Sequence, residues 1–368
     1  MTTQKKPLQM NSTGFKRGPQ QSQRGVALVL ALLIVALVTT IAVELSWRFD
    51  LSIVRAGNRW FGMQGDIYLR GAEDFAKWGL QQDKLQEQAS GKAIDTLYDV
   101  WATPLEAPID ESWIRGRMED AQGRFNLNLL AKSAQPIKGR APEPWERFTA
   151  SQRRFIRLLQ TINLSDSTLE GEGVYLDEQS AINITEAVID WIDVDSNVTG
   201  FGGAESDYYS GLEPPYLVAN KKFMSVSELY LIRGMNYKLY QGLLPFVIAL
   251  PEQALTNVNT MSLEMLRTIN DKRSLMPNSI EDAQYIFSER GGGFDTVGDF
   301  QGASSVDQVV GVAANGQSNF DATDLVVATE YFLLFTEVQV DDYIRRSKSL
   351  LRRVNDEVTT LRRTDANF

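Results

Sequence analysis

The sequence contains neither cysteine nor histidine. Without cysteine the chain can form no disulfide, no thiolate nucleophile and no Cys-ligated metal site. Without histidine it has no Ser–His–Asp triad, no His-bound zinc and no imidazole acid or base. Two kinds of chemistry remain open: catalysis by carboxylates alone, and sites for hard cations that take oxygen ligands.

Positive charge is also scarce, with 37 Lys and Arg against 47 Asp and Glu and a formal net charge of −10. This balance argues against a general affinity for nucleic-acid phosphates. The first 25 residues carry five basic residues and no acid, so the remainder carries −15. A hydrophobic content of 43% over 368 residues predicts a globular protein of two modest domains, or of one domain with a large insertion.

One long uncharged run begins at Val26 and ends at Val43, and the following residues extend it to Trp47. Its length is close to the ~20 residues that cross a bilayer core, and Trp47 would lie at the far interface. The basic residues before the run predict a cytoplasmic N-terminus and export of the rest of the chain. The sequence therefore predicts a protein held by a single membrane span.

Three interpretations of this N-terminus compete. A cleaved secretory signal needs a small-x-small site after the apolar core, and Ile41-Ala42-Val43 fits that poorly. A plain signal anchor is the second. The third, which we favour, is that Gly25-Val26 resembles a type IV prepilin processing site, where a peptidase cuts after the Gly and the apolar segment stays as the mature N-terminus.

Residues 47–88 contain no proline and repeat apolar residues at helical spacing. Together with the apolar run they predict one helix of about 55 residues, roughly 80 Å long at 1.5 Å per residue. Such a helix is typical of a pilin-like subunit. Most pilins and pseudopilins carry a Glu at the fifth mature position, but counting from Val26 this chain has Leu30 there.

The exported region mixes strand and helix patterns. Residues 112–128 read as a hairpin whose turn lies at 120–123. Helical patterns follow over 145–160, 180–192, 225–247 and 257–269, and the glycines at 291–293 are expected to end the helical region. From about residue 325 the period shifts to two, which predicts three or four antiparallel strands that complete the sheet begun at 113.

The predicted fold class is therefore α+β, in which a large helical segment is inserted between early and late strands. Residues 225–247 also resemble helix-hairpin-helix modules, some of which bind DNA. Simple helix packing is the preferred interpretation, because the surroundings are acidic and the segment is exported.

The 63 residues between Arg157 and Lys221 contain twelve acids and no Lys or Arg. Carboxylates this crowded repel one another unless a cation or solvent separates them, and Ca²⁺ takes six to eight oxygen ligands in loose geometry. The spacing is not that of an EF-hand. A solvated acidic loop and a glycosidase-type carboxylate pair are the alternatives. Four acids flank a glycine-rich loop in the centre of the stretch: Asp193, Asp195, Glu205 and Asp207.

Several motifs together resemble one family, protein K of the general secretion pathway, which comprises minor pseudopilins of type II secretion. They are the Gly25-Val26 junction without the fifth-position Glu, the Asp-Ala-Gln-Gly-Arg-Phe-Asn-Leu-Asn run at 120–128, the acidic loop at 190–209, and the segments at 225–229 and 257–260. The resemblance implies a pseudopilin fold, with a long N-terminal helix packed on an antiparallel sheet and a large α-helical insertion domain. It also implies calcium in the acidic loop, for which Asp193, Asp195, Glu205 and Asp207 are the candidates.

The resemblance further implies a non-enzymatic subunit in the inner membrane, with most of its mass in the periplasm and prepilin peptidase as its processing enzyme. The expected partners are the minor pseudopilins I and J at the pseudopilus tip, with exported proteins as further candidates and no nucleic acid. A minor pilin of a type IV pilus and a membrane-anchored carboxylate-dependent hydrolase are the alternatives. The predicted divisions are 1–25 (leader), 26–88 (membrane segment and helix), 89–144 (first part of the head), 145–293 (insertion) and 294–368 (last strands).

Overall fold

The computed structural model describes residues 24–109, 112–135, 137–165, 173–251, 253–313 and 318–364. These residues divide into two compact units, Met1–Phe61 and Gly62–Phe368. Helix α1 (Arg24–Ser90) contributes to both units. Most of the predicted leader, residues 1–23, lies outside the described residues.

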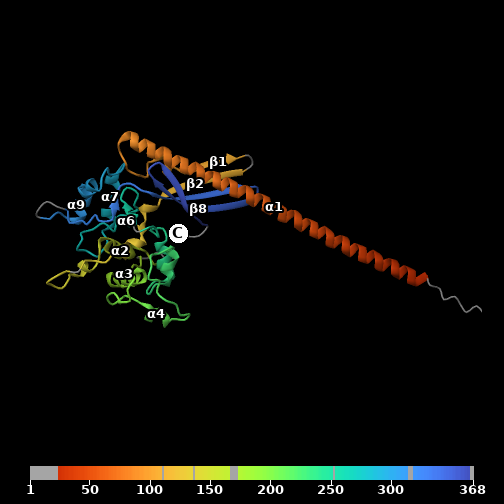
Figure 1. The fold of residues 1–368 in the computed structure, drawn as a ribbon, viewed down its shortest axis with the longest axis horizontal. Helices are drawn as coiled ribbons and strands as arrows, with labels where there is room; N and C mark the ends of the chain where they lie inside the picture. Colours follow the sequence, from red (N-terminus) through yellow and green to blue (C-terminus); the bar gives the residue numbers. More distant parts are fainter. Residues whose placement is uncertain are drawn as a thin grey trace, which may run out of the picture. The chain divides into compact units, whose positions relative to one another are not determined.

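The described residues of the first unit form the N-terminal part of α1 (Figure 1), and most of their large apolar side chains are exposed. Within the described part of the chain, α1 is the one helix that is long and apolar enough to cross a membrane. The hydroxyls of Thr39 and Thr40 donate to the carbonyls of Val35 and Ala36, at 2.7 and 2.8 Å, so neither is left unpaired in the apolar segment. The predicted continuous helix is confirmed, and at 67 residues it is longer than expected.

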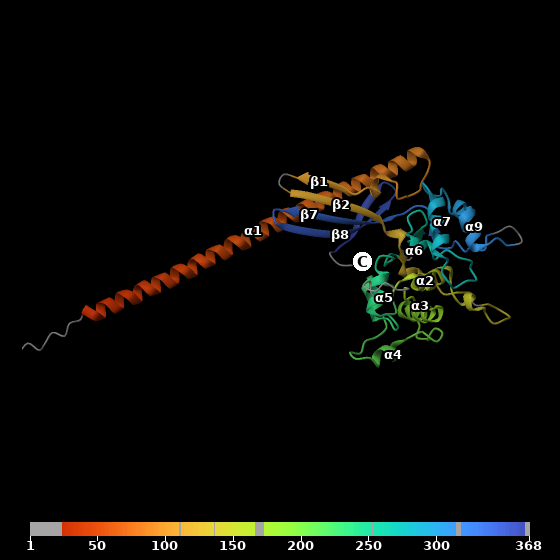
Figure 2. The ribbon, with the colours of Figure 1, turned by 180° about the vertical axis from the view of Figure 1, so that it is seen from behind.

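A five-stranded antiparallel sheet with the order β1-β2-β7-β8-β9 forms the base of the second unit. The end of α1 packs on one face of this sheet, where Leu80 joins Phe332, Leu334 and Leu351 in a buried cluster (Figure 2). The strands are β1 (Leu105–Ile109), β2 (Ser112–Asp120), β7 (Tyr331–Val340), β8 (Tyr343–Val354) and β9 (Glu357–Thr364). The predicted pairing of the late strands with the strand at 113 is confirmed.

A buried carboxylate fixes α1 to the far strands. Glu73 accepts a hydrogen bond from Ser349 on β8 at 2.8 Å, and Arg363 on β9 forms two hydrogen bonds to it at 2.6 and 2.8 Å. The hydroxyl of Thr360 also donates to Glu73. Because a buried charge is tolerated only with such partners, this contact sets how α1 lies across β8 and β9.

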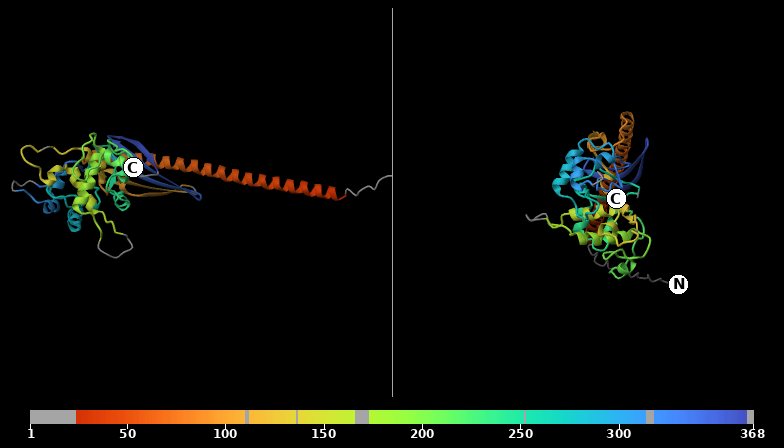
Figure 3. Two further views of the ribbon diagram at one scale, coloured as in Figure 1. Left: turned by 90° about the horizontal axis from the view of Figure 1, so that it is seen from below. Right: turned by 90° about the vertical axis from the view of Figure 1, so that its left-hand side faces the viewer.

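The segment between β2 and β7 contains the helical insertion that was predicted over 145–293, and it packs against the other face of the sheet (Figure 3). Ile248 and Leu250 of the insertion meet Leu333 and Leu350 of the sheet. The helices are α2 (Ala150–Thr161), α3 (Glu178–Ile192), α4 (Ser206–Ser210), α5 (Tyr237–Leu243), α6 (Leu263–Leu266), α7 (Ile280–Arg290), α8 (Val297–Gln301) and α9 (Ser304–Val310). Short 3-10 helices lie at Val100–Ala102, Ala121–Gly123, Leu127–Ala131, Pro144–Arg147 and Val226–Leu231.

Helix α2 shows how local signals and burial together fix the insertion. Thr149 and Gln152 form a capping box at its start, as the sequence pattern favours. The fully buried Arg157 then donates to the carbonyls of Thr268, Asp271 and Ser274, at 2.6–3.1 Å. The guanidinium thus pairs with backbone oxygens of a distant loop and ties the two halves of the insertion together.

The predicted hairpin at 112–128 is wrong. Its turn forms at the expected place, but β2 pairs with β1 and β7, whereas β3 (Phe125–Asn126) pairs in parallel with β4 (Val247–Ile248). The buried Asp120 carboxylate explains the change of direction. It accepts hydrogen bonds from the Asn257 amide at 2.8 Å and from the hydroxyls of Thr260 and Thr329 at 2.6 and 2.7 Å, which draws the chain toward the insertion.

The expected end of the helical region at residues 291–293 also needs correction. Helices α8 and α9 follow the glycines, and their residues Phe300 and Val306 belong to the same buried core as α2 and α3. The helical region therefore extends to Val310. A further small parallel pair, β5 (Thr256–Asn257) with β6 (Leu325–Val326), closes the insertion just before β7.

Candidate metal centre

Helix α3 carries the acidic stretch into the core and ends at its centre. Asp177 caps the N-terminus by accepting from the Ser180 amide at 2.7 Å, and the apolar face buries Ala187, Val188 and Trp191. The C-cap residue is Asp193. A carboxylate at a helix C-terminus faces the negative end of the helix dipole, so this position favours a compensating cation.

Three of the four predicted ligands come together at this helix end. Asp193, Asp195 and Glu205 each place a carboxylate oxygen within 4.8 Å of the others, and we call these three residues the acidic-loop cluster. Asp207 is not part of it. It lies in the first turn of α4 with its side chain exposed.

The glycine-rich loop between Asp195 and Glu205 folds tightly against α3, and this closeness explains its composition. A Cβ on Gly202 would lie 2.1 Å from the Cα of Asn183, and a Cβ on Gly203 would lie 2.3 Å from an oxygen of Asp190. The Gly202 amide also donates to the buried Glu186 carboxylate at 2.8 Å. Only glycine allows the loop to approach closely enough to bring Glu205 back to the helix end.

Asp190, one turn before Asp193, is a buried neighbour that was not among the predicted ligands. Its carboxylate accepts the Thr199 amide at 3.0 and 3.2 Å. It therefore shapes the loop and adds negative charge beside the cluster. Its spacing of three residues from Asp193 on a helix was the signal in the sequence that places both on one face.

The cluster contains buried oxygens without hydrogen-bond partners. Asp193 Oδ1 and both carboxylate oxygens of Glu205 are in this state. So is Asn220 Oδ1, whose amide nitrogen lies 3.5 Å from the Asp195 carbonyl oxygen. Leaving such groups unpaired costs about 1–3 kcal/mol each, and more when they are charged. No sequence pattern singled out Asn220, because this residue reaches the loop only through the fold.

Electrostatics reinforces the need for a cation. Burial and repulsion from Asp195, Asp190 and Glu205 raise the pKa of Asp193 to about 7. Burial, and then repulsion from Asp190 and Asp195, also raises the pKa of Glu205. Among the described residues no Lys or Arg forms an ion pair with any of these four carboxylates. Oxygen ligands in a partly buried loop fit a calcium ion, and they offer no softer donor for a transition metal.

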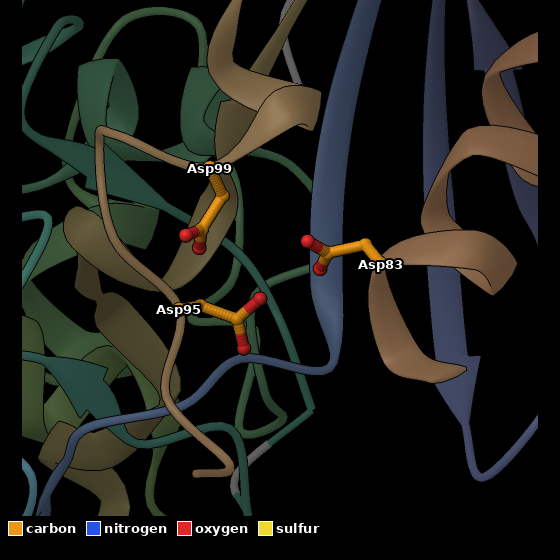
Figure 4. A group of neighbouring side chains, drawn as sticks. All are labelled: Asp83, Asp95 and Asp99. Carbon is orange, nitrogen blue, oxygen red and sulfur yellow. The ribbon is translucent and has the colours of Figure 1, made fainter. Parts of the chain in front are cut away.

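A second carboxylate group, at the end of α1, already has its cation. Asp83 projects from α1 toward Asp95 and Asp99 on the following loop (Figure 4). Arg353 of β8 pairs with Asp83 at 2.7 Å, with Asp95 at 2.5 Å and with Glu87 at 3.1 Å. We call Arg353 and these three partners the Arg353 cluster.

Several other oxygens around the Arg353 cluster accept hydrogen bonds within the protein. The second oxygen of Asp95 accepts the Thr329 amide at 2.7 Å. Asp99 accepts the Thr96 amide at 2.7 Å and the Trp101 indole at 3.2 Å. This site is therefore structural, and its guanidinium holds the place that a metal ion would take.

The predicted processing residues Gly25 and Val26 lie in the first turn of α1. Both are exposed, which leaves the junction accessible on that side of the apolar segment. Cleavage between them stays a prediction.

Residues 123–252, which include the acidic-loop cluster, match the model of the family described as type II secretion system (T2SS), protein K. The chain is 32% identical over 342 residues to the type II secretion system protein K of Pseudomonas aeruginosa, covering 92% of this chain and 91% of that protein. This chain belongs to the type II secretion system protein K family. The type II secretion system protein K of Pectobacterium carotovorum subsp. carotovorum is 30% identical to this chain, and the alignment covers 93% of this chain and 96% of that protein.

A solved structure gives the same fold. The complex of GspK, GspI and GspJ from the type 2 secretion system of enterotoxigenic Escherichia coli contains a chain that superposes with a TM-score of 0.64. The two chains are 24% identical, and the match covers 84% of this chain and 98% of the other. The predicted pseudopilin fold is thereby confirmed, and the chain is a minor pseudopilin of type II secretion.

Proposed function

We propose that this chain is the tip subunit of the pseudopilus, where it initiates assembly with the minor pseudopilins I and J and supports protein export without an enzymatic role. The solved relative was crystallised as a complex with two such proteins, GspI and GspJ, which supports partners of the same kind here. In this proposal α1 is held in the inner membrane with its N-terminus in the cytoplasm, and the second unit lies in the periplasm.

The observation that carries the tip role is Leu30. Counted from Val26, it stands at the fifth position of the mature chain, where other pilin-like subunits have a carboxylate. A carboxylate in hydrocarbon costs about 2.5–3.5 kcal/mol, so it is kept only where a neighbouring subunit compensates it. A subunit at the tip has no subunit above it, and an apolar Leu30 on an exposed helix face meets that requirement at no such cost.

Processing by a prepilin peptidase is the first test. Mass spectrometry of the chain purified from membranes of a host with that peptidase should give an N-terminus at Val26. An intact leader, or a cut after the apolar run, would contradict the proposal. Gly25→Leu is the matched variant, because it changes the junction alone and should accumulate the uncut form.

Position in the fibre is the second test. Overproduced pseudopili that contain an epitope-tagged copy of this chain should carry the label at one end in electron micrographs. Label along the whole shaft would contradict the tip role and leave the family assignment intact. Secretion of the host's exported proteins should stop in a deletion strain and return with the untagged chain.

We also propose that the acidic-loop cluster binds calcium, with Asp193, Asp195 and Glu205 as carboxylate ligands and Asn220 Oδ1 as a fourth oxygen. The unpaired buried oxygens support this assignment. The ion would hold the end of α3, the glycine loop and the segment at Asn220 together, which is a structural task in a chain without disulfides. Isothermal titration of the chelator-treated chain with Ca²⁺ tests it, and the absence of binding heat would contradict it.

A further inference from the structure

The sheet face that lies opposite α1 is not fully covered by the insertion. Near the insertion, Leu333 and Leu350 are buried against Ile248 and Leu250. Further along the same strands the described part of the insertion no longer lines this face, and the outward-pointing side chains there are charged or aromatic. Two connected clefts, of about 520 and 200 Å³, lie along this part of the face.

Strand register places the side chains of this face in two parallel rows. In the first row Arg117 of β2, Phe335 of β7 and Lys348 of β8 stand directly opposite one another. The Arg117 guanidinium carbon lies 4.1 Å from the centroid of the Phe335 ring, and Lys348 Nζ lies 5.9 Å from it on the other side. The aromatic ring is thus flanked by two cations.

The second row consists of Arg115, Glu337 and Arg346, again directly opposite one another. Glu337 is shared between the two arginines, at 3.9 Å from Arg115 and 2.5 Å from Arg346. Arg115 is also paired with Glu106, at 3.0 Å. Each guanidinium carries five donors, so both arginines keep donors for another partner.

The smaller cleft continues the first row toward the insertion. Arg117, Phe335 and Lys348 line both clefts, and the smaller one adds Arg124 together with apolar residues of the insertion, such as Val226 and Val247. Arg124 and Arg117 share a single carboxylate, Glu119. Burial and the neighbouring Arg124 lower the pKa of Arg117, as expected where positive charges are crowded. We call this surface the cationic groove: Arg115, Arg117, Arg124, Phe335, Arg346 and Lys348.

The groove is opposite in sign to the rest of the chain. Among the described residues, five cations line it together with three carboxylates, Glu106, Glu119 and Glu337, in a protein whose formal charge is −10. Its floor is an aromatic ring with an apolar wall, so a fitting ligand has carboxylates and at least one apolar side chain. Arginine pairs with carboxylates through two parallel hydrogen bonds, and buried Arg and aromatic residues carry much of the binding energy of protein interfaces.

We propose that the cationic groove is the docking surface for an acidic segment of a partner pseudopilin, whose carboxylates pair with Arg117, Arg346 and Lys348 while an apolar side chain covers Phe335. This inference rests on the proposed function for the identity of the partner, and it adds the surface and the chemistry of recognition.

The test measures binding of the full-length chain, in detergent, to purified pseudopilins I and J at low and at high salt. Arg117→Gln combined with Lys348→Gln should weaken binding to one of the two about tenfold, and high salt should weaken the wild type in the same way. The matched control is Lys138→Gln with Lys272→Gln, which removes the same charge from exposed positions outside the groove and should bind as the wild type does.

A second measurement does not depend on the fold tolerating a variant. A carbodiimide couples an amine to a carboxylate that it already contacts, so the mixed complex should yield a cross-linked peptide that joins Lys348 to an Asp or Glu of the partner. Lys348→Arg keeps the charge and should keep the affinity, but it should lose this cross-link.

The outcomes separate the two proposals. Partner binding that is equal in the wild type and in the groove variant, with no cross-link at Lys348, overturns the groove and leaves the proposed function standing. A wild-type chain that binds neither pseudopilin overturns both. If the groove variant loses self-association, or loses binding to vesicles of anionic lipid, while its pseudopilin binding is unchanged, the groove belongs to another occupant and the inference is wrong.

Discussion

The Arg353 cluster and the acidic-loop cluster solve the same electrostatic problem in different ways. Each gathers three carboxylates near the end of a helix, and in each at least one of them is buried. The first contains a guanidinium from a distant strand, within 3.1 Å of all three of its carboxylates. The second contains no such cation among the described residues, and buried oxygens of Asp193 and Glu205 have neither a hydrogen bond nor an ion pair there. The first junction therefore carries its own cation, whereas the second, under the calcium proposal, takes its cation from the solution.

Loss of the internal cation should have the largest effect. Arg353→Gln leaves Asp83, Glu87 and Asp95 buried without their partner, and removal of one member of a buried ion pair costs about 3–5 kcal/mol. Urea denaturation should show this loss in the free energy of unfolding. The control is Arg352→Gln on the same strand, whose pair with Glu330 at 3.2 Å is at the surface and is worth about 0–1 kcal/mol. Equal losses in the two variants would mean that the Arg353 cluster does not stabilise the junction.

The second largest effect is expected from calcium, which should stabilise the chain through the acidic-loop cluster and not through the Arg353 cluster. At a calcium concentration about 100 times Kd, the free energy of unfolding of the wild type should exceed its value in chelator by about 2.7 kcal/mol. The stability difference between Asp193→Asn and the wild type should change sign with calcium. In chelator the variant should be more stable, because repulsion is relieved, and in calcium it should be less stable, because a ligand is lost. Asp95→Asn, in the Arg353 cluster, should be insensitive to calcium. A wild-type melting curve that is unchanged by chelator would contradict the calcium proposal.

The third effect in size is expected in the pH dependence of stability. Without calcium, burial and repulsion from Asp195 raise the pKa of Asp193 from 3.8 to about 7, so the folded state binds a proton more tightly than the unfolded chain does. The resulting stability is present below pH 3.8 and is lost as the pH rises to about 7. In chelator, the wild type should therefore lose more stability than Asp193→Asn over this range. In calcium the difference should run the other way, because the ion needs the ionised carboxylate.

The smallest effect is expected at Asp207. The side chain is exposed and outside the acidic-loop cluster, so Asp207→Asn should change stability by less than about 0.5 kcal/mol and leave the calcium response intact. Glu205→Asn tests the same loop two residues earlier and should abolish the response. A calcium response that is lost in Asp207→Asn would return this residue to the ligand set that the sequence predicted.

The sequence predicted what depends on local pattern. Apolar spacing gave α1 and α3, and strand alternation gave β7, β8 and β9 with their place beside β2. The position of Asp193 and Asp195 near Glu205 followed from the glycine-rich loop between them. These features depend on residues close together in the chain, where helical or strand period carries the information.

The features that were missed depend on contacts between distant residues. Asp120 turns the chain because its partners lie at Asn257 and Thr329, so the pattern at 112–128 resembled a hairpin. Arg353 meets Asp83 across 270 residues, and nothing near either one marks the pair. Asp207 looked equivalent to Asp195, because composition does not tell which carboxylate a short helix turns outward.

The insertion leaves and returns at neighbouring positions of the sheet, since Asp120 at the end of β2 lies opposite Phe332 near the start of β7. The strand pair that forms the middle of the sheet therefore closes a loop of more than 200 residues, and contacts this distant in sequence form slowly unless the chain between them is already compact. The helical insertion, with a core of its own, would shorten that search by folding first and presenting both ends together. In this chain the helical insertion would thus also promote the pairing of β2 with β7.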